Sequence, residues 1–287
     1  MFLTCNILTS APELPAETLA ESCYGYMFSG CTSLTKAPEL PAETLAEHCY
    51  EYMFNNSGMT VAPELPATVM KPYCYQYMFQ SCSSLTTAPV LPAMTLADSC
   101  YKYMFQRCYA LTTAPELPAT SVLGSCYSYM FASCQSLNAA PELPATALRN
   151  SCYAYMFTGC FNLLKAPSIL PATGLRDNCY KGMFNGCSFL TKTPVLPATE
   201  LKPSCYREMF QNCYALTTAP ELPATTLADS CYMYMFNGCS KLTTAPELPA
   251  TTLAASCYSS MFTNCASLTT APELPATTLA DSCYFRM

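Results

Sequence analysis

The sequence has little of what most enzymes and metal proteins need. Only 11% of its 287 residues are charged, and His48 is the single histidine. It contains no Cys–His pair, no Gly-rich phosphate loop and no pair of carboxylates standing apart from a repeated pattern, so we expect no catalysis. Because zinc ligands recur at short Cys and His spacings that are missing here, we also expect no metal site and no cofactor.

Several partner classes and locations are also disfavoured. No run approaches the roughly 18 apolar residues of a membrane span. The first residues lack the basic region and apolar core of a signal peptide. The net charge of −6 argues against a nucleic-acid partner. Positive charge is nevertheless concentrated, because nine of the thirteen Lys and Arg residues lie within residues 102–207, beside four acidic residues.

The sequence does contain an internal repeat. The dipeptide Cys-Tyr recurs at steps of 26 residues, apart from one step of 25 and one of 27. Its cysteines are Cys23, Cys49, Cys74, Cys100, Cys126, Cys152, Cys179, Cys205, Cys231, Cys257 and Cys283. Pro-x-Leu-Pro-Ala recurs in every copy, stretched only at Pro167, and Met-Phe-x-x-Cys-x-x-Leu breaks only at Met53. We therefore expect a single repeat domain over residues 1–287, with about eleven tandem repeats.

Both ends of the sequence fall in mid-repeat. Met1 and Phe2 have the phase of Met27 and Phe28, and the last residue follows a Cys-Tyr motif. Neither end has the distinct capping sequence that solenoids normally need. The expectation is a fragment of a longer array, or a chain whose ends are covered by a partner.

The first half of each repeat has the apolar spacing of a short helix. Leu19, Cys23 and Met27 are four residues apart, and a second apolar row runs beside them, which predicts a helix of about three turns. Thr18 and Glu21 form a capping box at its start. Seven copies carry Gly or Asn before the second Cys, which is typical of the left-handed residue that ends a helix. These are Gly30, Asn56, Gly159, Gly186, Asn212, Gly238 and Asn264.

The second half of each repeat favours an extended path. Pro38 and Pro41 exclude another helix, and the residues just before Ala-Pro are predicted to pair as a short strand. Consecutive strands joined by a helix should be parallel, with right-handed connections. We therefore expect an α/β fold, a right-handed solenoid of about eleven 26-residue helix/short-strand coils, in which equivalent side chains stack and share one core.

The 21 cysteines occupy two phases of the repeat. The second cysteine follows the Cys of Cys-Tyr by eight residues, which is about 12 Å along a helix and too far for a disulfide. We interpret both rows as small buried hydrophobic residues in a ladder. Bridges between equivalent cysteines of adjacent coils remain an alternative.

One phase carries a glutamate in most copies. With coils about 5 Å apart, neighbouring carboxylates repel by roughly 0.8 kcal/mol in water, which cation binding would relieve. A solvated face is the simpler interpretation, because three copies lack the glutamate without any other change. The stripe comprises Glu13, Glu39, Glu64, Glu116, Glu142, Glu221, Glu247 and Glu273.

A tyrosine recurs two residues after Cys-Tyr, at the edge of the apolar face. We expect partial exposure and packing between coils, with an aromatic strip for adhesion as the alternative. The tyrosines are Tyr26, Tyr52, Tyr77, Tyr103, Tyr129, Tyr155 and Tyr234.

The basic window also carries unusual aromatics near the second Cys, where other copies have small polar residues. Because binding surfaces are rich in aromatics and Arg, we predict a ligand patch here, with neutral drift among copies as the alternative. The candidate ligand-binding residues are Tyr109, Phe161, Lys165, Lys181, Phe189, Lys192, Arg207 and Tyr214.

The string from Tyr26 to Thr35, Tyr-Met-Phe-Ser-Gly-Cys-Thr-Ser-Leu-Thr, resembles the repeat of BspA-like leucine-rich-repeat surface proteins, which is marked by (Ala or Met)-Phe-x-x-Cys-x-x-Leu. The likeness extends over essentially the whole chain. It implies a curved leucine-rich-repeat solenoid with strands on one side and helices on the other. It also implies a bacterial protein at the cell surface or secreted, which adheres to macromolecules of a host or neighbouring cell.

The function expected from the sequence is therefore a non-catalytic binding or adhesion scaffold. Its partner would be a protein or glycan on a host or neighbouring cell, recognised through the solenoid surface. The alternative is a structural stalk or fibre module whose copies associate end to end.

Overall fold

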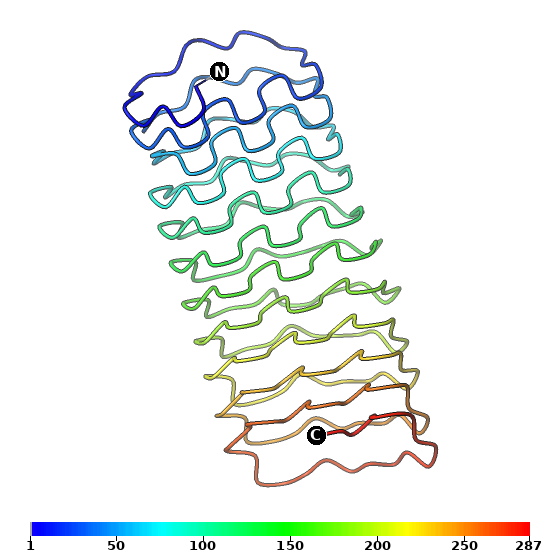
Figure 1. Ribbon diagram of the computed structural model, residues 1–287. Helices are drawn as coiled ribbons and strands as arrows, with labels where there is room; N and C mark the ends of the chain where they lie inside the picture. Colours follow the sequence, from blue (N-terminus) through cyan, green and yellow to red (C-terminus); the bar gives the residue numbers. More distant parts are fainter. Residues whose placement is uncertain (1) are drawn as a thin grey trace.

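The computed structural model describes residues 2–287 as a stack of flattened coils. Successive coils follow one another from the N-terminus at one end of the stack to the C-terminus at the other (Figure 1). A single hydrophobic core runs through the stack from Leu14 to Cys283. The repeat solenoid expected from the 26-residue period is therefore present.

The helix predicted in each coil is wrong. Residues 2–287 contain no α-helix; residues 21–30 and their equivalents form overlapping turns, which we call the turn ribbon. The amide of Gly25 donates to the Ser22 carbonyl, three residues back. The amide of Tyr24, by contrast, donates to the carbonyl of Cys49 in the next coil. Alternate amides thus close turns and join neighbouring coils.

The exact four-residue spacing explains why a ribbon replaces a helix. A helix turns by about 100° per residue, so a row spaced by four drifts by about 40° at each step and leaves the core within three steps. Packed helices also lie about 8–10 Å apart. Equivalent core rings of successive coils, such as Tyr101 and Tyr127, have centroids 5.9 Å apart. Coils at this spacing have no room for helices side by side.

In each ribbon, every fourth residue has a left-handed backbone conformation, which repeats the turn. In the first complete ribbon these are Ser22, Tyr26 and Gly30, with φ of 54°, 57° and 75°. The Gly and Asn residues before the second Cys all have positive φ, so the left-handed conformation predicted there is confirmed, although no helix ends at it. Residues other than Gly strain the backbone there by roughly 1–2 kcal/mol each. The inter-coil hydrogen bonds offset this strain.

The opposite wall is extended, and its strand is shorter than predicted. Only isolated parallel bridges join successive coils, for example Lys36 to Val61 and Val61 to Thr87. The parallel orientation is confirmed, but residues 2–287 contain no longer strand. Proline explains this difference, because Pro38 and Pro41 have no amide hydrogen to donate to a ladder.

The core lies between the two walls. The ribbon contributes pairs such as Cys100 with Tyr101 and Met104 with Phe105, all at most 1% exposed, and the extended wall contributes the Leu and Ala of Pro-x-Leu-Pro-Ala. The phenylalanine rings form one ladder with centroid spacings of 5.5–5.8 Å. The tyrosines of Cys-Tyr form a second ladder at 5.5–5.9 Å. Equivalent side chains of successive coils therefore lie on top of one another.

Candidate functional site

The cysteines are part of the packing, not a reactive site. All 21 are free thiols, and every one except Cys5 and Cys23 is buried. The thiol of Cys134 donates to the Phe105 carbonyl of the preceding coil at 3.1 Å, and the same bond recurs along the second cysteine row. Burial raises the pKa of the Cys100 thiol to about 12. Such thiols stay protonated at neutral pH and are poor nucleophiles, as the buried ladder interpretation requires.

The glutamate stripe is a solvated surface row. Its eight glutamates are all exposed. At the coil where serine replaces glutamate, the carboxylate of Glu142 accepts hydrogen bonds from the Ser168 amide at 3.0 Å and the Ser168 hydroxyl at 2.8 Å. Among residues 2–287, no three His, Cys, Asp or Glu side chains are grouped to hold a metal ion.

Three of the candidate aromatics gather where the ribbon turns into the extended wall. Phe161, Phe189 and Tyr214 lie on three successive coils and are 46%, 55% and 48% exposed. The Phe189 amide donates to the Phe161 carbonyl at 3.2 Å, which sets these two coils in register. Leu164, 48% exposed, lies on the same coil as Phe161.

Two of the candidate lysines flank these aromatics. Lys165 and Lys192 form a parallel bridge between adjacent coils, and both side chains are exposed. Together the six residues make an apolar surface with a positive border, which we call the corner patch. It comprises Phe161, Leu164, Lys165, Phe189, Lys192 and Tyr214.

The other three candidates lie outside the corner patch. Tyr109 has the same phase but sits two coils before Phe161, beyond the coil of Gln135. Lys181 and Arg207 lie in the middle of the turn ribbon, on its outer face. One predicted patch is therefore divided between two surfaces.

The outer face of the ribbon carries the recurring tyrosines as a stacked column. Rings from Tyr26 to Tyr155 stack with centroids 4.2–4.8 Å apart. All but Tyr26 are half-buried. The inter-coil packing expected for this row is confirmed.

The column ends where the next coil has Gly182. A Cβ atom there would lie 2.2 Å from the Tyr155 ring, so the ring occupies the space beside the glycine. The Tyr155 hydroxyl reaches past Gly182 and donates a hydrogen bond at 2.8 Å to the carboxylate of Glu208, on the coil after that of Gly182. Arg207 donates to the same carboxylate at 2.8 Å. Burial is the main cause of the raised pKa of Tyr155, and its hydrogen bond to Glu208 adds to it.

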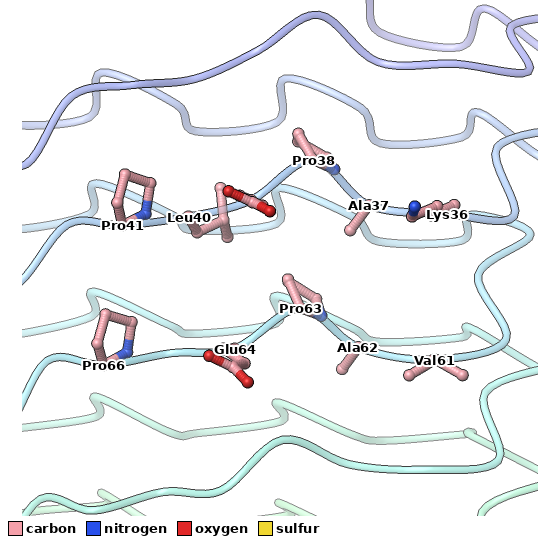
Figure 2. Close-up of a pocket in the computed structure, with 11 residues that line it drawn as sticks. Lys36, Ala37, Pro38, Leu40, Pro41, Val61, Ala62, Pro63, Glu64 and Pro66 are labelled. Atoms are coloured by element: carbon pink, nitrogen blue, oxygen red, sulfur yellow. The ribbon is translucent and has the colours of Figure 1, made fainter.

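Grooves open between coils on the extended wall. One, of about 570 Å³, lies between the segments 36–41 and 61–66, and a second of about 520 Å³ precedes it. Figure 2 shows Pro38 above Pro63 and the carboxylate of Glu64 at the edge of the larger one. Residues 38–42 and 63–67 make no backbone hydrogen bond to another described residue. In the sequence, these grooves correspond to the two prolines of Pro-x-Leu-Pro. The same motif lines the groove between other pairs of coils, so it does not single out one groove as a binding site.

No helix of membrane-spanning length and hydrophobicity occurs in the part of the chain that the structure describes.

Comparison with known proteins gives one result. No curated protein and no solved structure matches the chain. The family described as BspA type leucine rich repeat region (6 copies) matches residues 2–138, 98–243 and 180–286, which together span nearly all of it. The period, the Met-Phe-x-x-Cys-x-x-Leu motif and this match agree, and the chain belongs to the BspA-type leucine-rich-repeat family.

Proposed function

We propose that the protein is a non-catalytic binding and adhesion scaffold, located at the cell surface or secreted, which binds a partner on a host or neighbouring cell. Proteins of this family are often surface adhesion or binding proteins. The observation that carries the proposal is the corner patch, where Phe161, Phe189 and Tyr214 expose about half of their side chains on three successive coils. Exposed aromatics gathered in this way are typical of binding surfaces.

For the corner patch we favour a protein partner over a glycan. Its centre is apolar, with Leu164 beside the three aromatics, and its charges lie at the border. An apolar centre with a polar rim is the usual anatomy of a protein–protein interface. Lys165 and Lys192 would then raise the association rate of an acidic partner.

The test replaces the three aromatics with the small polar residue that other copies carry. Phe161→Ser, Phe189→Ser and Tyr214→Ser are made together, and binding is measured against an array of purified extracellular host proteins. Removing buried aromatic anchors should weaken binding of any true partner at least about tenfold. Tyr109→Ser is the control, because Tyr109 occupies the same position in its repeat as Phe161 but lies two coils before it, outside the corner patch. Equal affinity of the triple variant and the control would remove the corner patch as the binding site.

The alternative function, a stalk or fibre whose copies stack end to end, makes a different prediction. The last coil exposes Leu274 at 48% and Leu279 at 64%, whose equivalents in the middle of the stack are covered, and a stacked copy would cover them. Light scattering over a range of protein concentrations distinguishes the two functions. Growing assemblies favour the stalk, while a constant mass favours the binding scaffold.

A further inference from the structure

A trough crosses four coils on the outer face of the turn ribbon, away from the corner patch. It is shallow and open to solvent, with a volume of about 230 Å³. Its floor is formed by Ser128 and Ala154, which are 4% and 5% exposed. At the same position the neighbouring coils carry Lys102 and Lys181, which close the two ends. The trough exists because two small residues stand between two long ones in one column.

The two side walls of the trough differ in chemistry. One is the tyrosine column, through Tyr103, Tyr129 and Tyr155. The other is polar and comprises Ser125, Ser151 and Asn178, whose side chains make no hydrogen bond to any residue within 2–287. A ligand in the trough would therefore find aromatic surface on one side and free hydroxyl and amide groups on the other.

The ends of the trough are positively charged. Lys102 Nζ lies 5.6 Å from the Tyr103 ring centroid, and Lys181 Nζ lies 5.7 Å from that of Tyr155. Neither lysine forms an ion pair with any residue of 2–287. No carboxylate lines the trough. Two carboxylates lie nearby: Asp98 accepts a hydrogen bond from the Gly124 amide, and Glu208 accepts hydrogen bonds from the Tyr155 hydroxyl and from Arg207.

The backbone around the trough has no free groups for a peptide. The amides of Ser125, Tyr129 and Ser151 donate to carbonyls of the next coil at 2.9–3.1 Å, and the remaining amides between Ser125 and Met130 are paired in the same way or within turns. An extended peptide binds an exposed sheet edge mainly through main-chain hydrogen bonds, which this surface cannot offer. Side-chain hydroxyls and an amide suit a ligand that itself carries many hydroxyls.

From these observations we propose that the trough binds a short acidic oligosaccharide, with the sugar hydroxyls on Ser125, Ser151 and Asn178 and its carboxylates on Lys102 and Lys181. Three coil steps separate the two lysines, which at the spacing of parallel strands is roughly 14 Å. The ligand is therefore a chain with acidic groups at both ends, not a single sugar. This site goes beyond the proposed function and is independent of the corner patch.

The test is a calorimetric titration of the full chain with an oligomer of uronic-acid units of defined length. A neutral oligosaccharide of equal length and a glutamate peptide of equal charge are titrated in parallel. The uronic-acid oligomer should bind more tightly than both. Equal binding of the neutral oligomer would overturn the role of the lysines, and tighter binding of the peptide would overturn the sugar assignment.

Variants locate the binding. Lys102→Gln with Lys181→Gln should weaken it by about tenfold or more, since charged hydrogen bonds are lost at both ends. Ala154→Gln should block the trough without unfolding the ribbon, because Gln76 occupies the same column in another coil. The control, Lys36→Gln with Lys241→Gln, removes the same charge elsewhere. Equal effects of the two double variants, or unchanged binding by Ala154→Gln at an unchanged melting temperature, would refute the site. Binding that survives the corner-patch triple variant shows that the two surfaces act separately.

Discussion

The hydroxyl of Tyr155 donates a hydrogen bond to Glu208 across 2.8 Å and 53 residues of sequence. It passes over the coil of Gly182, whose missing side chain gives the Tyr155 ring its place. Gly182→Ala should therefore destabilise the array, because its Cβ would lie 2.2 Å from the ring and φ there is +58°. We expect a loss of about 2–4 kcal/mol from overpacking and backbone strain, seen as a lower thermal midpoint.

Tyr155→Phe separates the hydrogen bond from the packing. The ring remains, but Glu208 keeps only Arg207 as a side-chain partner. A hydrogen bond to a charged group contributes about 1.5–3 kcal/mol, so this variant should lower the free energy of unfolding by an amount in that range. A variant as stable as the parent protein would show that the hydrogen bond contributes nothing.

Removing the hydroxyl of two core tyrosines should have the opposite effect on the free energy of unfolding. The hydroxyls of Tyr75 and Tyr206 are buried and have no hydrogen-bond partner in the described chain. Because an unsatisfied buried hydroxyl costs about 1–3 kcal/mol, Tyr75→Phe and Tyr206→Phe should each raise the free energy of unfolding. Denaturant titration of these variants beside Tyr155→Phe provides the comparison. A loss of stability in both core variants would contradict the unsatisfied hydroxyls.

Thiol chemistry should divide the cysteines into two groups. Cys5 and Cys23 are exposed, while the other nineteen are buried. A thiol reagent added to the native protein should label the first two quickly and the remainder only as the array opens. Mass spectrometry after a short pulse counts the labelled sites. Rapid labelling of mid-array thiols such as Cys134 would contradict the closed core.

Stability should fall at alkaline pH. Burial raises the pKa of Cys100 and Cys179 to about 12 and that of Cys82 to about 11, whereas thiols in an unfolded chain have a pKa of about 8.5. The unfolded state therefore loses protons first. Stability should be complete below about pH 8 and decline as pH rises toward the pKa of the folded thiols. Unfolding under reducing conditions at several pH values measures this, and a constant free energy from neutral pH to about pH 10 would contradict it.

Much of the architecture was predictable from the sequence. The 26-residue period places Tyr101 over Tyr127 and Cys108 next to Cys134, and both rows are buried as predicted. The left-handed position was visible in residues such as Gly30 and Asn56, since few other residues favour positive φ. These features follow from which residue recurs at each position of the repeat. They can be predicted without knowing the distance between coils.

The ribbon was not predictable from one repeat. Leu19, Cys23 and Met27 fit both a helix and a ribbon of turns over so short a stretch. The two differ in where the amides donate, which is to the same segment in a helix and partly to the next coil in a ribbon. Two steps of four residues are too few for the drift of a helix to show, and the distance between neighbouring coils, which decides between the two, is not carried by a single repeat.

The candidate sites show the same division. Sequence alone identified Phe161, Phe189 and Tyr214 as departures from the repeat, and stacking then placed them together. Lys181 lies in the same basic window of the sequence but on the outer face of the ribbon. The small residues Ser128 and Ala154, which form the floor of the trough, do not depart from the repeat motifs, and only a comparison of that position across copies shows them between Lys102 and Lys181.

By itself the sequence determined the period, the composition of the core and the family, because each follows from which residue recurs at which phase. Only the tertiary structure decided the form of the wall and the grouping of the surface residues. The physical reason is that coils whose equivalent core rings lie only 5.5–5.9 Å apart must share backbone hydrogen bonds, which excludes helices and places side chains 26 residues apart in contact.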